Sequence, residues 1–513
     1  MSSCLFLFIC VAVAAVDIFV SPSGNDSADG LTSATPVRTS LPVLAVLRQP
    51  QTLLRLHFGA GTFSGDECYW PIGTVAAPHI AVEVEGNGTV FACPSLHANA
   101  SALMSVSASN TIDVRGIEWT QLFAVCPAGR CAALLLSSPA LLRLDRLRVT
   151  NCSFFVTHFG ADADERMAAP VVAHGATIVD VANSVFANNS LELGLPSVGV
   201  SGNRLIAVGS AALAVNDTFS VLLQNVTFHA NAVRSMSSNV TTGGAAMLVK
   251  SYANSLVNVT VLVAECLIDA NRVESSGGAV GGAVLVTASS SSVRVSFADS
   301  TISFQELRSH GNALSGPFIL AGAAVAGFQH DDLDTPLRFS VSISQCSLSF
   351  NVIESPVQLA RVIGGLVLCG TLTLQDSTLH SNQVSAVTVS GGLLMAFRSM
   401  TISNCSITQT NVTIPAHRVS ADFNGSLAFL SLSDSDCHTA MSWNVSRLVV
   451  SGSFVQPGAA LSGQPALFLA DATQCRFAVL AIDAADFDNN YAVISEGACL
   501  RWGLWRFAFF SVC

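Results

Sequence analysis

The chain has 513 residues, of which 50% are hydrophobic and 11% are charged, and its formal net charge is −11. This composition is too apolar for a disordered chain, and it supplies enough side chains for a continuous core. The negative charge and the scattered Lys and Arg residues exclude nucleic acid and an anionic membrane surface as expected partners, because both are bound by clustered basic residues.

The first residues predict a secretory signal peptide over residues 1–16. An uncharged run, Leu5–Val13, leads into small residues that fit an Ala-x-Ala cleavage pattern at Ala12–Ala14, although no Lys or Arg precedes the run. The run is shorter than the roughly 20 residues that span a bilayer. A buried N-terminal strand or a short anchor helix is the alternative interpretation.

Residues 17–78 carry the pattern of a cap and first strands. Val-Ser-Pro-Ser-Gly-Asn-Asp at 20–26 is followed by Thr-Pro-Val-Arg-Thr at 35–39, a helix-length stretch Leu41–Arg48, and a strand that ends in Gly-Thr-Phe at 61–63. Such a succession would cover the open end of a β-solenoid. It resembles the N-terminal cap of right-handed parallel β-helix proteins of the pectin-lyase-like superfamily.

Two short signals alternate along the middle of the chain. Glycine pairs or a Gly-Ala step open apolar runs, as at Gly243-Gly244, Gly281-Gly282 and Gly364-Gly365, and a small-x-apolar-x-x-Asn corner recurs between them. Together they resemble the repeats of chlamydial polymorphic outer-membrane proteins. The corner asparagines, whose amides can pass hydrogen bonds from coil to coil, are Asn189, Asn231, Asn271, Asn351 and Asn382, with Gln305 in the place of one copy.

The spacing of these corners, roughly 30 to 45 residues, predicts a solenoid whose coils hold three short strands. The expected fold is all-β, a right-handed parallel β-helix over residues 79–490 with a short N-terminal cap helix. A C-terminal apolar segment covers residues 491–513. The uncharged stretch Asn312–Gln329 contains Pro317 and internal glycines, so it is interpreted as core rather than as a membrane span.

Glycosylation sequons are more frequent than chance predicts, although Asn and Ser/Thr are also common in β-turns. The excess favours a secretory route, with glycans on exposed turns of a protein that is extracellular or on the cell surface. The expected glycosylated residues are Asn25, Asn87, Asn99, Asn151, Asn188, Asn216, Asn225, Asn239, Asn258, Asn404, Asn411, Asn424 and Asn444.

The cysteines fall into two groups. Cys126 with Cys131, and Cys68 with Cys93, lie in irregular regions and are the expected disulfides. The second group, Cys152, Cys266, Cys346 and Cys405, precedes an apolar corner residue by two positions. With coils about 4.8 Å apart, no two of the four would be close enough to bridge, so we expect free buried thiols.

The resemblance to the pectin-lyase-like group implies that polysaccharide lyase or glycoside hydrolase chemistry is one possible function. Glycoside hydrolysis needs two carboxylates, which stacked strands would hold in this fold, but the outward strand positions read mainly as Ser, Thr, Val and Asn. The acidic run Asp331–Asp334 is interpreted as a solvated or weak calcium-binding loop rather than as a stacked catalytic pair. No His-x-x-x-His or Cys-x-x-Cys pair is present.

The sequence therefore predicts no catalytic residues, no metal and no cofactor. The predicted function is a non-enzymatic rod with a structural or adhesive role, and the alternative is a polysaccharide lyase or glycoside hydrolase. Expected partners are extracellular glycans or cell-surface proteins, with membrane attachment only through an anchor that the chain does not show. Three or more charged side chains that converge on neighbouring coils would favour the enzyme.

Overall fold

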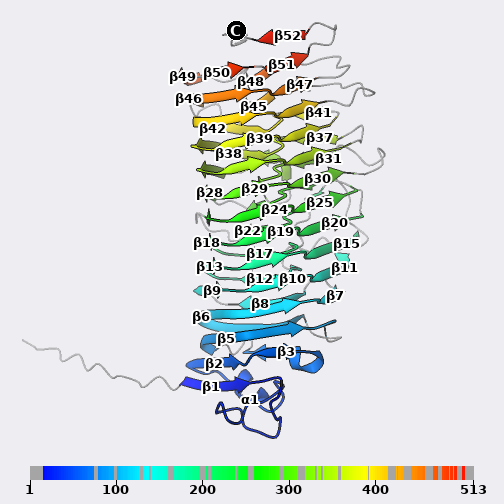
Figure 1. The fold of residues 1–513 in the computed structure, drawn as a ribbon, viewed down its shortest axis with the longest axis vertical. Helices are drawn as coiled ribbons and strands as arrows, with labels where there is room; N and C mark the ends of the chain where they lie inside the picture. Colours follow the sequence, from blue (N-terminus) through cyan, green and yellow to red (C-terminus); the bar gives the residue numbers. More distant parts are fainter. Residues whose placement is uncertain are drawn as a thin grey trace, which may run out of the picture.

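The protein is a right-handed parallel β-helix, an elongated stack of coils that runs from the N-terminal cap to the C-terminal strands (Figure 1). The computed structural model describes residues 15–502 apart from 74–78, 97–100, 127–130, 138–139, 160–166, 197–203, 206–209, 237–239, 252–258, 277, 289–292, 310–317, 330–331, 337–338, 356–359, 387, 391, 414–422, 425, 432–440, 457–465, 472–476, 484–485, 489 and 494–498. The expected signal peptide thus lies almost wholly outside the described residues, as does most of the C-terminal apolar segment.

The strands of successive coils fall into as many as five rows, numbered in chain order within a coil. Rows 1, 2 and 3 form one continuous parallel sheet, and the chain passes from row 3 into row 4 through the Asn corner. Row 1 contains β4 (Trp70–Ile72), β8 (Ala132–Ser137), β12 (Val171–His174), β17 (Leu213–Asn216), β22 (Met247–Ser251), β27 (Val284–Ala288), β32 (Val325–Gln329), β45 (Ser426–Ser431) and β48 (Ala466–Asp471). Row 2 contains β1 (Ala15–Val20), β2 (Leu53–Phe58), β9 (Leu141–Asp145), β13 (Ile178–Ala182), β18 (Ser220–Gln224), β23 (Val259–Ala264), β28 (Val293–Ala298), β34 (Phe339–Ser344) and β49 (Phe477–Asp483).

Row 3 contains β3 (Gly61–Phe63), β10 (Arg148–Thr150), β14 (Val185–Ala187), β19 (Thr227–His229), β24 (Leu267–Asp269), β29 (Thr301–Ser303), β35 (Ser347–Ser349), β39 (Thr378–His380) and β50 (Asp486–Asp488). Five long strands cross from one row into the next: β5 (His79–Ala92), β6 (Ala102–Thr120), β38 (Val367–Gln375), β42 (Leu394–Thr408) and β46 (Met441–Ser451). Neighbouring coils pair in parallel and in register along these rows.

Rows 4 and 5 form separate narrower sheets. Row 4 contains β7 (Phe123–Cys126), β11 (Ser153–Phe159), β15 (Ser190–Pro196), β20 (Ala232–Ser235), β25 (Arg272–Ser275), β30 (Glu306–Ser309), β36 (Val352–Glu354), β40 (Gln383–Ser385), β43 (Asn411–Thr413), β47 (Phe454–Gln456), β51 (Asn490–Val493) and β52 (Cys499–Trp502). Row 5 contains β16 (Arg204–Leu205), β21 (Val240–Gly243), β26 (Ala279–Val280), β31 (Phe318–Ala321), β37 (Ala360–Ile363), β41 (Thr388–Ser390) and β44 (Phe423–Asn424).

The interior is a continuous stack of apolar side chains, one layer per coil. In the first coils it is aromatic: Phe91 stacks on Phe63 at 5.1 Å and on Trp119 at 5.8 Å between ring centroids. Further along, Phe186 stacks on Phe228 at 5.1 Å. Because side chains alternate between the two faces of a strand, row 2 leaves its second set of side chains on the outside of the rod, whereas the strands β17, β22 and β27 of row 1 are buried on both faces.

The glycine pairs stand where the next coil comes too close for a side chain. A Cβ on Gly243 would lie 1.7 Å from the carbonyl oxygen of Val280, and one on Gly365 would lie 2.3 Å from that of Gly392. Gly244 also has a positive φ of 77°, a conformation that glycine adopts without steric cost. These glycines therefore permit the tight passage from row 5 into row 1.

The Asn corner forms a buried ladder of side-chain amides. Asn189 donates to Asn231 at 3.0 Å, and Asn231 donates to Asn271 at 2.9 Å. Asn351 donates in the same way to Asn382 at 2.9 Å, and each of these asparagines is at most 1% exposed. Gln305 occupies the intervening rung and donates to the carbonyl of Ile268 at 2.8 Å, while its own amide oxygen has no partner.

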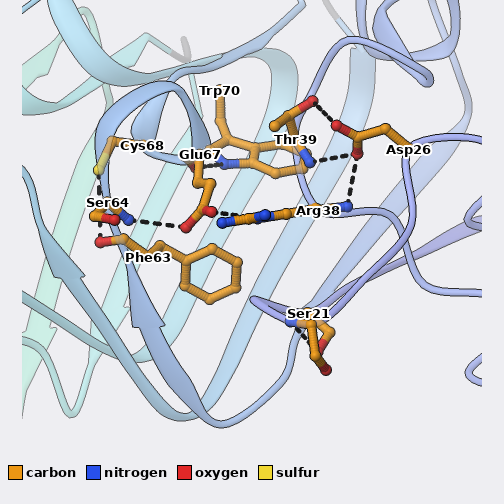
Figure 2. A network of polar contacts seen from close by, with 10 residues as sticks. Ser21, Asp26, Arg38, Thr39, Phe63, Ser64, Glu67, Cys68 and Trp70 are labelled. Atoms are coloured by element: carbon orange, nitrogen blue, oxygen red, sulfur yellow. Dashed lines mark hydrogen bonds and ion pairs between the residues drawn. The ribbon is translucent and has the colours of Figure 1, made fainter.

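The cap is built around β1, the five-residue helix α1 (Leu44–Arg48) and the 3-10 turn η1 (Gly65–Cys68). Asp26 accepts hydrogen bonds from the backbone N–H groups of Arg38 and Thr39, each at 2.9 Å, and Arg38 also pairs with Glu67 (Figure 2). Burial opposes ionisation of Asp26, but these hydrogen bonds outweigh it and lower the pKa of the carboxyl. The network joins the Asp-rich turn to the first coil.

His79 connects α1 to the same coil from the inside. It is fully buried, its Nδ1 accepts from the N–H of Gln51 at 3.1 Å, and its Nε2 lies 2.8 Å from the carbonyl oxygen of Leu47. Burial lowers the pKa of this imidazole. Protonation of His79 at low pH should therefore weaken the contact between α1 and this coil.

Two disulfides lie in the first coils, Cys68–Cys93 and Cys126–Cys131, while Cys266, Cys346 and Cys405 are free and buried. These three share one column of row 3, in which they alternate with serines. Burial raises the pKa of the Cys266 thiol to about 11.

The expected place of Cys152 is wrong. Cys152 is also free and buried, but its N–H donates to the amide oxygen of Asn189, so it occupies the Asn column one coil earlier. The error arises because the expected register aligns Phe154 with Phe186. In the structure Phe154 pairs with Leu191 in row 4, and Val149 pairs with Phe186.

Candidate functional site

Two columns of charged residues run along the outer face of row 2 in the first coils. Because neighbouring strands lie about 4.8 Å apart, side chains at the same register position on successive coils are neighbours. The first column consists of Asp17, Arg55, Glu83, Asp113, Arg143 and Asp180. The second column, two residues further along each strand, consists of His57, Glu85, Arg115 and Asp145.

The charges are joined into a network of ion pairs. Arg55 Nε lies 2.8 Å from Glu83 Oε2, and Arg143 Nε lies 3.6 Å from Asp180 Oδ2. Arg115 makes a two-pronged contact with Asp113, in which Nε lies 2.7 Å from Oδ1 and the second prong joins Nη2 to Oδ2. A fork of this kind fixes both groups, since a planar guanidinium matches the two oxygens of a carboxylate.

Two carboxylates stand side by side within this network. Glu83 on β5 pairs in register with Asp113 on β6, with no residue between them in the column. Like charges opposite each other across paired strands destabilise a sheet. The arrangement therefore costs stability that the fold alone does not require, and Arg55, Arg115 and Arg143 surround it.

The two carboxylates differ in exposure. The Glu83 side chain is 49% exposed, whereas that of Asp113 is 9% exposed beneath the guanidinium of Arg115. The pKa of Arg115 is raised, first by its hydrogen bond to Asp113 and further by the negative charges of Asp113, Glu83 and Asp145. One guanidinium is thus placed among three carboxylates from three successive coils.

The charged columns end after β13. Beyond Asp180 the first column continues as Leu222, Leu262, Ser296, Ser342, Thr373 and Thr401. The expected outward Ser and Thr are found in this column from Ser296 onward, whereas the first coils carry charged residues and the two coils between carry Leu222 and Leu262. We call the charged residues of row 2 from Asp17 to Asp180 the charged strip.

A second polar column lies on the outer side of row 1. His174, Asn216, Lys250 and Thr287 follow one another in register, and the Nδ2 of Asn216 lies 3.0 Å from His174 Nδ1. Asn216, Lys250 and Thr287 are only 2%, 3% and 4% exposed. Buried groups cannot contact a polymer along their length, so this column is not the candidate site.

The sequon asparagines are distributed over the corners and outer faces. Asn216 contradicts the expectation of exposure, because it ends β17 in the buried polar column. Asn99, Asn239 and Asn258 lie outside the described residues, and for Asn424 only the backbone, in β44, is described. The exposed ones are Asn25, Asn87, Asn151, Asn188, Asn225, Asn404, Asn411 and Asn444.

The acidic run at 331–334 is not a loop throughout. Asp332–Pro336 forms β33, which pairs antiparallel with β32. Among the residues that the structure describes, no group of three or more His, Cys, Asp or Glu is placed to hold a metal ion. Within the same part of the chain, no helix is long and apolar enough to cross a membrane.

No protein-family model matches the chain, and no curated protein matches it either. Among solved structures it is similar to the pectate lyase Pel9A, with 11% identity and a TM-score of 0.29 over 74% of this chain and 79% of that one. It is also similar to a GH136 lacto-N-biosidase from Eubacterium ramulus (9% identity, TM-score 0.22, 92% and 68% covered). A rhamnogalacturonan lyase gives 10% identity and a TM-score of 0.21, with 81% and 86% covered. Such likenesses concern the fold and assign no activity to this chain.

The prediction that the protein is not an enzyme is wrong, because the converging charged groups whose absence it assumes are present in the charged strip. The three similar solved structures are named as enzymes, which describes those proteins. Sequence reasoning missed the charged groups because consecutive members of a column lie about 30 residues apart. The alternation in Val82-Glu83-Val84-Glu85 and in Ile112-Asp113-Val114-Arg115 was the available signal.

Proposed function

We propose that the protein is a carbohydrate-active enzyme that binds an extended polysaccharide along the charged strip and hydrolyses it there. The observation that carries the proposal is the side-by-side placement of Glu83 and Asp113 on neighbouring coils, with Arg115 among them. This proposal takes the place of a purely structural or adhesive role.

The spacing of the pair suits one class of mechanism. Carboxyl groups about 5 to 5.5 Å apart support glycoside hydrolysis with retention of configuration, and strands about 4.8 Å apart hold the two residues near that range. Asp113, held by Arg115, would attack the anomeric carbon and form a glycosyl ester. Glu83, the more exposed of the two, would protonate the departing glycosidic oxygen and then take a proton from the water that cleaves the ester.

The rest of the charged strip would hold the polymer. Arg55, Arg143 and Asp180 lie in the same column as the pair, on both sides of it along the rod. Guanidinium and carboxylate groups hydrogen-bond to hydroxyl groups and, in the case of Arg, to substrate carboxylates. A linear glycan parallel to the rod axis would meet one set of these groups at every coil.

A secreted protein is the setting that fits this activity. The N-terminal apolar run, the exposed sequons and the two disulfides of the first coils support passage through the secretory pathway. The proposed partners are extracellular glycans. The resemblance to the repeats of chlamydial polymorphic outer-membrane proteins stays a prediction. The display of loops by the later coils, which that resemblance implies, also stays a prediction.

The test is cleavage of purified polysaccharides by the full chain and by Glu83→Gln and Asp113→Asn. Homogalacturonan, rhamnogalacturonan, xylan and β-glucan would be assayed for new reducing ends, and for unsaturated ends by ultraviolet absorbance. We expect reducing ends without unsaturated ends, and a loss of at least about a hundredfold in both variants. Ser342→Ala, at the same register position on a later coil, should retain full activity.

Two results would overturn the proposal. One is cleavage that survives both substitutions in folded protein, and the other is a failure to bind or cleave any of the four polymers. Unsaturated ends that depend on Arg115 would replace hydrolysis by elimination at the same strip.

A further inference from the structure

We infer that the corner between rows 3 and 4 carries a separate binding notch for one ring of a neutral sugar, formed by Phe304, Ala270, Asp269 and Arg272. On nine coils the corner residue has a positive φ, between 52° and 60°. Along the rod these residues are Gln121, Asn151, Asn188, Ala230, Ala270, Phe304, Phe350, Ser381 and Gln409.

Phe304 and Phe350 are unusual at this corner for two reasons. A bulky residue rarely adopts positive φ, because its Cβ crowds the following carbonyl group. Both rings are also open to solvent, with Phe304 55% and Phe350 42% exposed. Neither the backbone nor the core therefore accounts for phenylalanine on these two coils, and an exposed aromatic pair is a common element of sugar recognition.

Phe350 covers one face of the Phe304 ring, and small corner residues precede the other face. On the covered side Phe350 stacks on it at 5.0 Å between centroids and 7° between planes, and His380 follows edge-on to Phe350 at 5.4 Å. On the other side the next corner residues are Ala270 and then Ala230. Their methyl groups leave a step of one to two coils, about 5 to 10 Å, and a sugar ring stacked at about 4 Å fits that height.

Polar groups border the step on both sides. Asp269 ends β24 in row 3, where its Oδ2 lies 3.0 Å from His229 Nδ1 and its Oδ1 accepts from the hydroxyl of Ser303 at 2.8 Å. Arg272 begins β25 in row 4 and its Nε lies 2.9 Å from Glu306. Carboxylate and guanidinium groups can both bond to vicinal hydroxyls, while the ring covers the C–H face of a pyranose.

The occupant is therefore a neutral pyranose rather than an anionic group or a lipid. The charges at the notch are already paired with one another: Arg272 contacts Glu274 and Glu306, and Asp269 Oδ2 lies 3.0 Å from His229 Nδ1. An acidic sugar or an anionic headgroup would have to compete with these carboxylates for Arg272, whereas neutral hydroxyls can bond to the pairs without separating them. A protein partner would need an apolar area larger than the one ring face that the corner offers.

The notch lies apart from the charged strip. It is on a different side of the coil, and four coils separate Asp113 from Leu262, the row 2 residue of the notch coil. That is about 19 Å along the rod. The inference does not depend on cleavage at Glu83 and Asp113, and a glycan could occupy the notch whether or not the strip is catalytic.

The test uses isothermal titration of the full chain with cellohexaose, xylohexaose and mannohexaose, and saturation-transfer NMR to detect sugar C–H groups against aromatic rings. We expect at least one of the three to bind. Phe304→Ala should weaken its Kd about tenfold, because the stacking face is lost. Ala270→Gln should weaken binding comparably by covering that face, and Gln121 and Gln409 show that the corner accepts glutamine.

The controls separate binding from folding and from the proposed catalysis. Phe123, 54% exposed elsewhere on the rod, gives the matched variant Phe123→Ala, which should bind like the unchanged chain. Phe304→Ala should not lower the unfolding midpoint, since alanine already occupies the corner at 230 and 270. Phe304→Ala would also be assayed for polysaccharide cleavage. If it binds the oligosaccharide weakly but still cleaves polysaccharide, the charged strip is active without the notch.

Equal binding by the unchanged chain, Phe304→Ala and Ala270→Gln would overturn the inference, as would no binding of any of the three oligosaccharides. Stronger binding of an acidic than of a neutral hexasaccharide at this corner would overturn the assignment of a neutral sugar.

Discussion

The first coils and the middle coils are the same on the inside and different on the outside. One inward column of row 2 runs without interruption from Leu56, Val84 and Val114 to Phe297 and Ile343, all buried. The outward column beside it changes from charged residues to Ser296, Ser342, Thr373 and Thr401. Because the middle coils fold with uncharged residues in this outward column, the charges of the strip are an addition to the fold rather than a condition of it.

The coils also differ in what fixes their corners. The middle coils are held by buried amides that pass hydrogen bonds along the rod. The first coils have stacked aromatic rings and two disulfides instead. Substitutions that remove one of these elements at a time compare the two regions by the stability that each substitution costs.

Removal of one rung of the amide ladder should have the largest effect. Asn231→Ala removes the acceptor of the Asn189 backbone N–H and side-chain amide, and it removes the donor to the Phe186 carbonyl and to the Asn271 amide oxygen, all of them buried. We expect a loss of about 3 kcal/mol in the free energy of unfolding, measured by urea denaturation. Gln224→Ala, an exposed position on β18, should change it by less than about 0.5 kcal/mol. Equal losses in the two variants would show that the ladder does not stabilise the corner.

Removal of the guanidinium from the charged strip should cost less. Arg115→Ala leaves the nearly buried Asp113 carboxylate without its fork. We expect a loss of about 2 kcal/mol by the same measurement, and a partial recovery in the double variant Arg115→Ala with Asp113→Asn. Ser342→Ala, on the outer face of a middle coil, should be neutral. A neutral result for Arg115→Ala would mean that the strip contributes nothing to stability.

The cap should respond to acid through His79. Burial lowers the pKa of the folded imidazole, so below about pH 6.5 the unfolded chain binds a proton that the folded chain does not. Stability should fall as the pH decreases from there toward the folded pKa, by up to about 1.4 kcal/mol per pH unit. Thermal melts of the full chain from pH 7 to pH 5 would measure this. His79→Gln should be less stable at pH 7 but should lose this part of the pH dependence, and an unchanged pH profile would contradict the assignment.

The smallest effect is expected in the thiol column. Cys346→Ser places a hydroxyl where the coils on either side already have Ser300 and Ser377. We expect a change of less than about 1 kcal/mol in the free energy of unfolding. In the unchanged protein, burial raises the pKa of the Cys346 thiol, so a maleimide reagent should label it only after denaturation. Rapid labelling of the folded chain would show that the column is accessible.

Much of the fold was predictable because the middle coils repeat their constraints. Gly243 and Gly365 stand where a side chain would collide with the next coil, and the asparagines stand where a buried amide must both donate and accept. Both constraints permit few residue types, so they remain visible in the sequence. The first coils share the glycine constraint at Gly86 and Gly116 but without the repeated glycine pair, and many different sequences can supply their aromatic packing. The strand register of the first coils could therefore not be predicted from the sequence. This explains why Cys152 was assigned to the wrong column and why the proximity of Glu83 and Asp113 was missed.

The candidate sites were harder to predict for a related reason. A pair such as Phe304 and Phe350 is separated by a full coil, and an exposed phenylalanine looks like a core residue in a sequence. Only the positive φ of the corner, a property of the folded backbone, shows that these rings point outward.

The last described strand bears on self-association. The rod adds parallel strands coil by coil, so its final coil would present unpaired N–H and C=O groups to which another molecule could add in the same direction. In row 4, β52 instead runs antiparallel along β51, from Asn490 opposite Trp502 to Val493 opposite Cys499. The reversed strand covers that edge, and its direction does not match the next parallel coil. At this edge of row 4, backbone direction alone therefore opposes the addition of a further parallel strand.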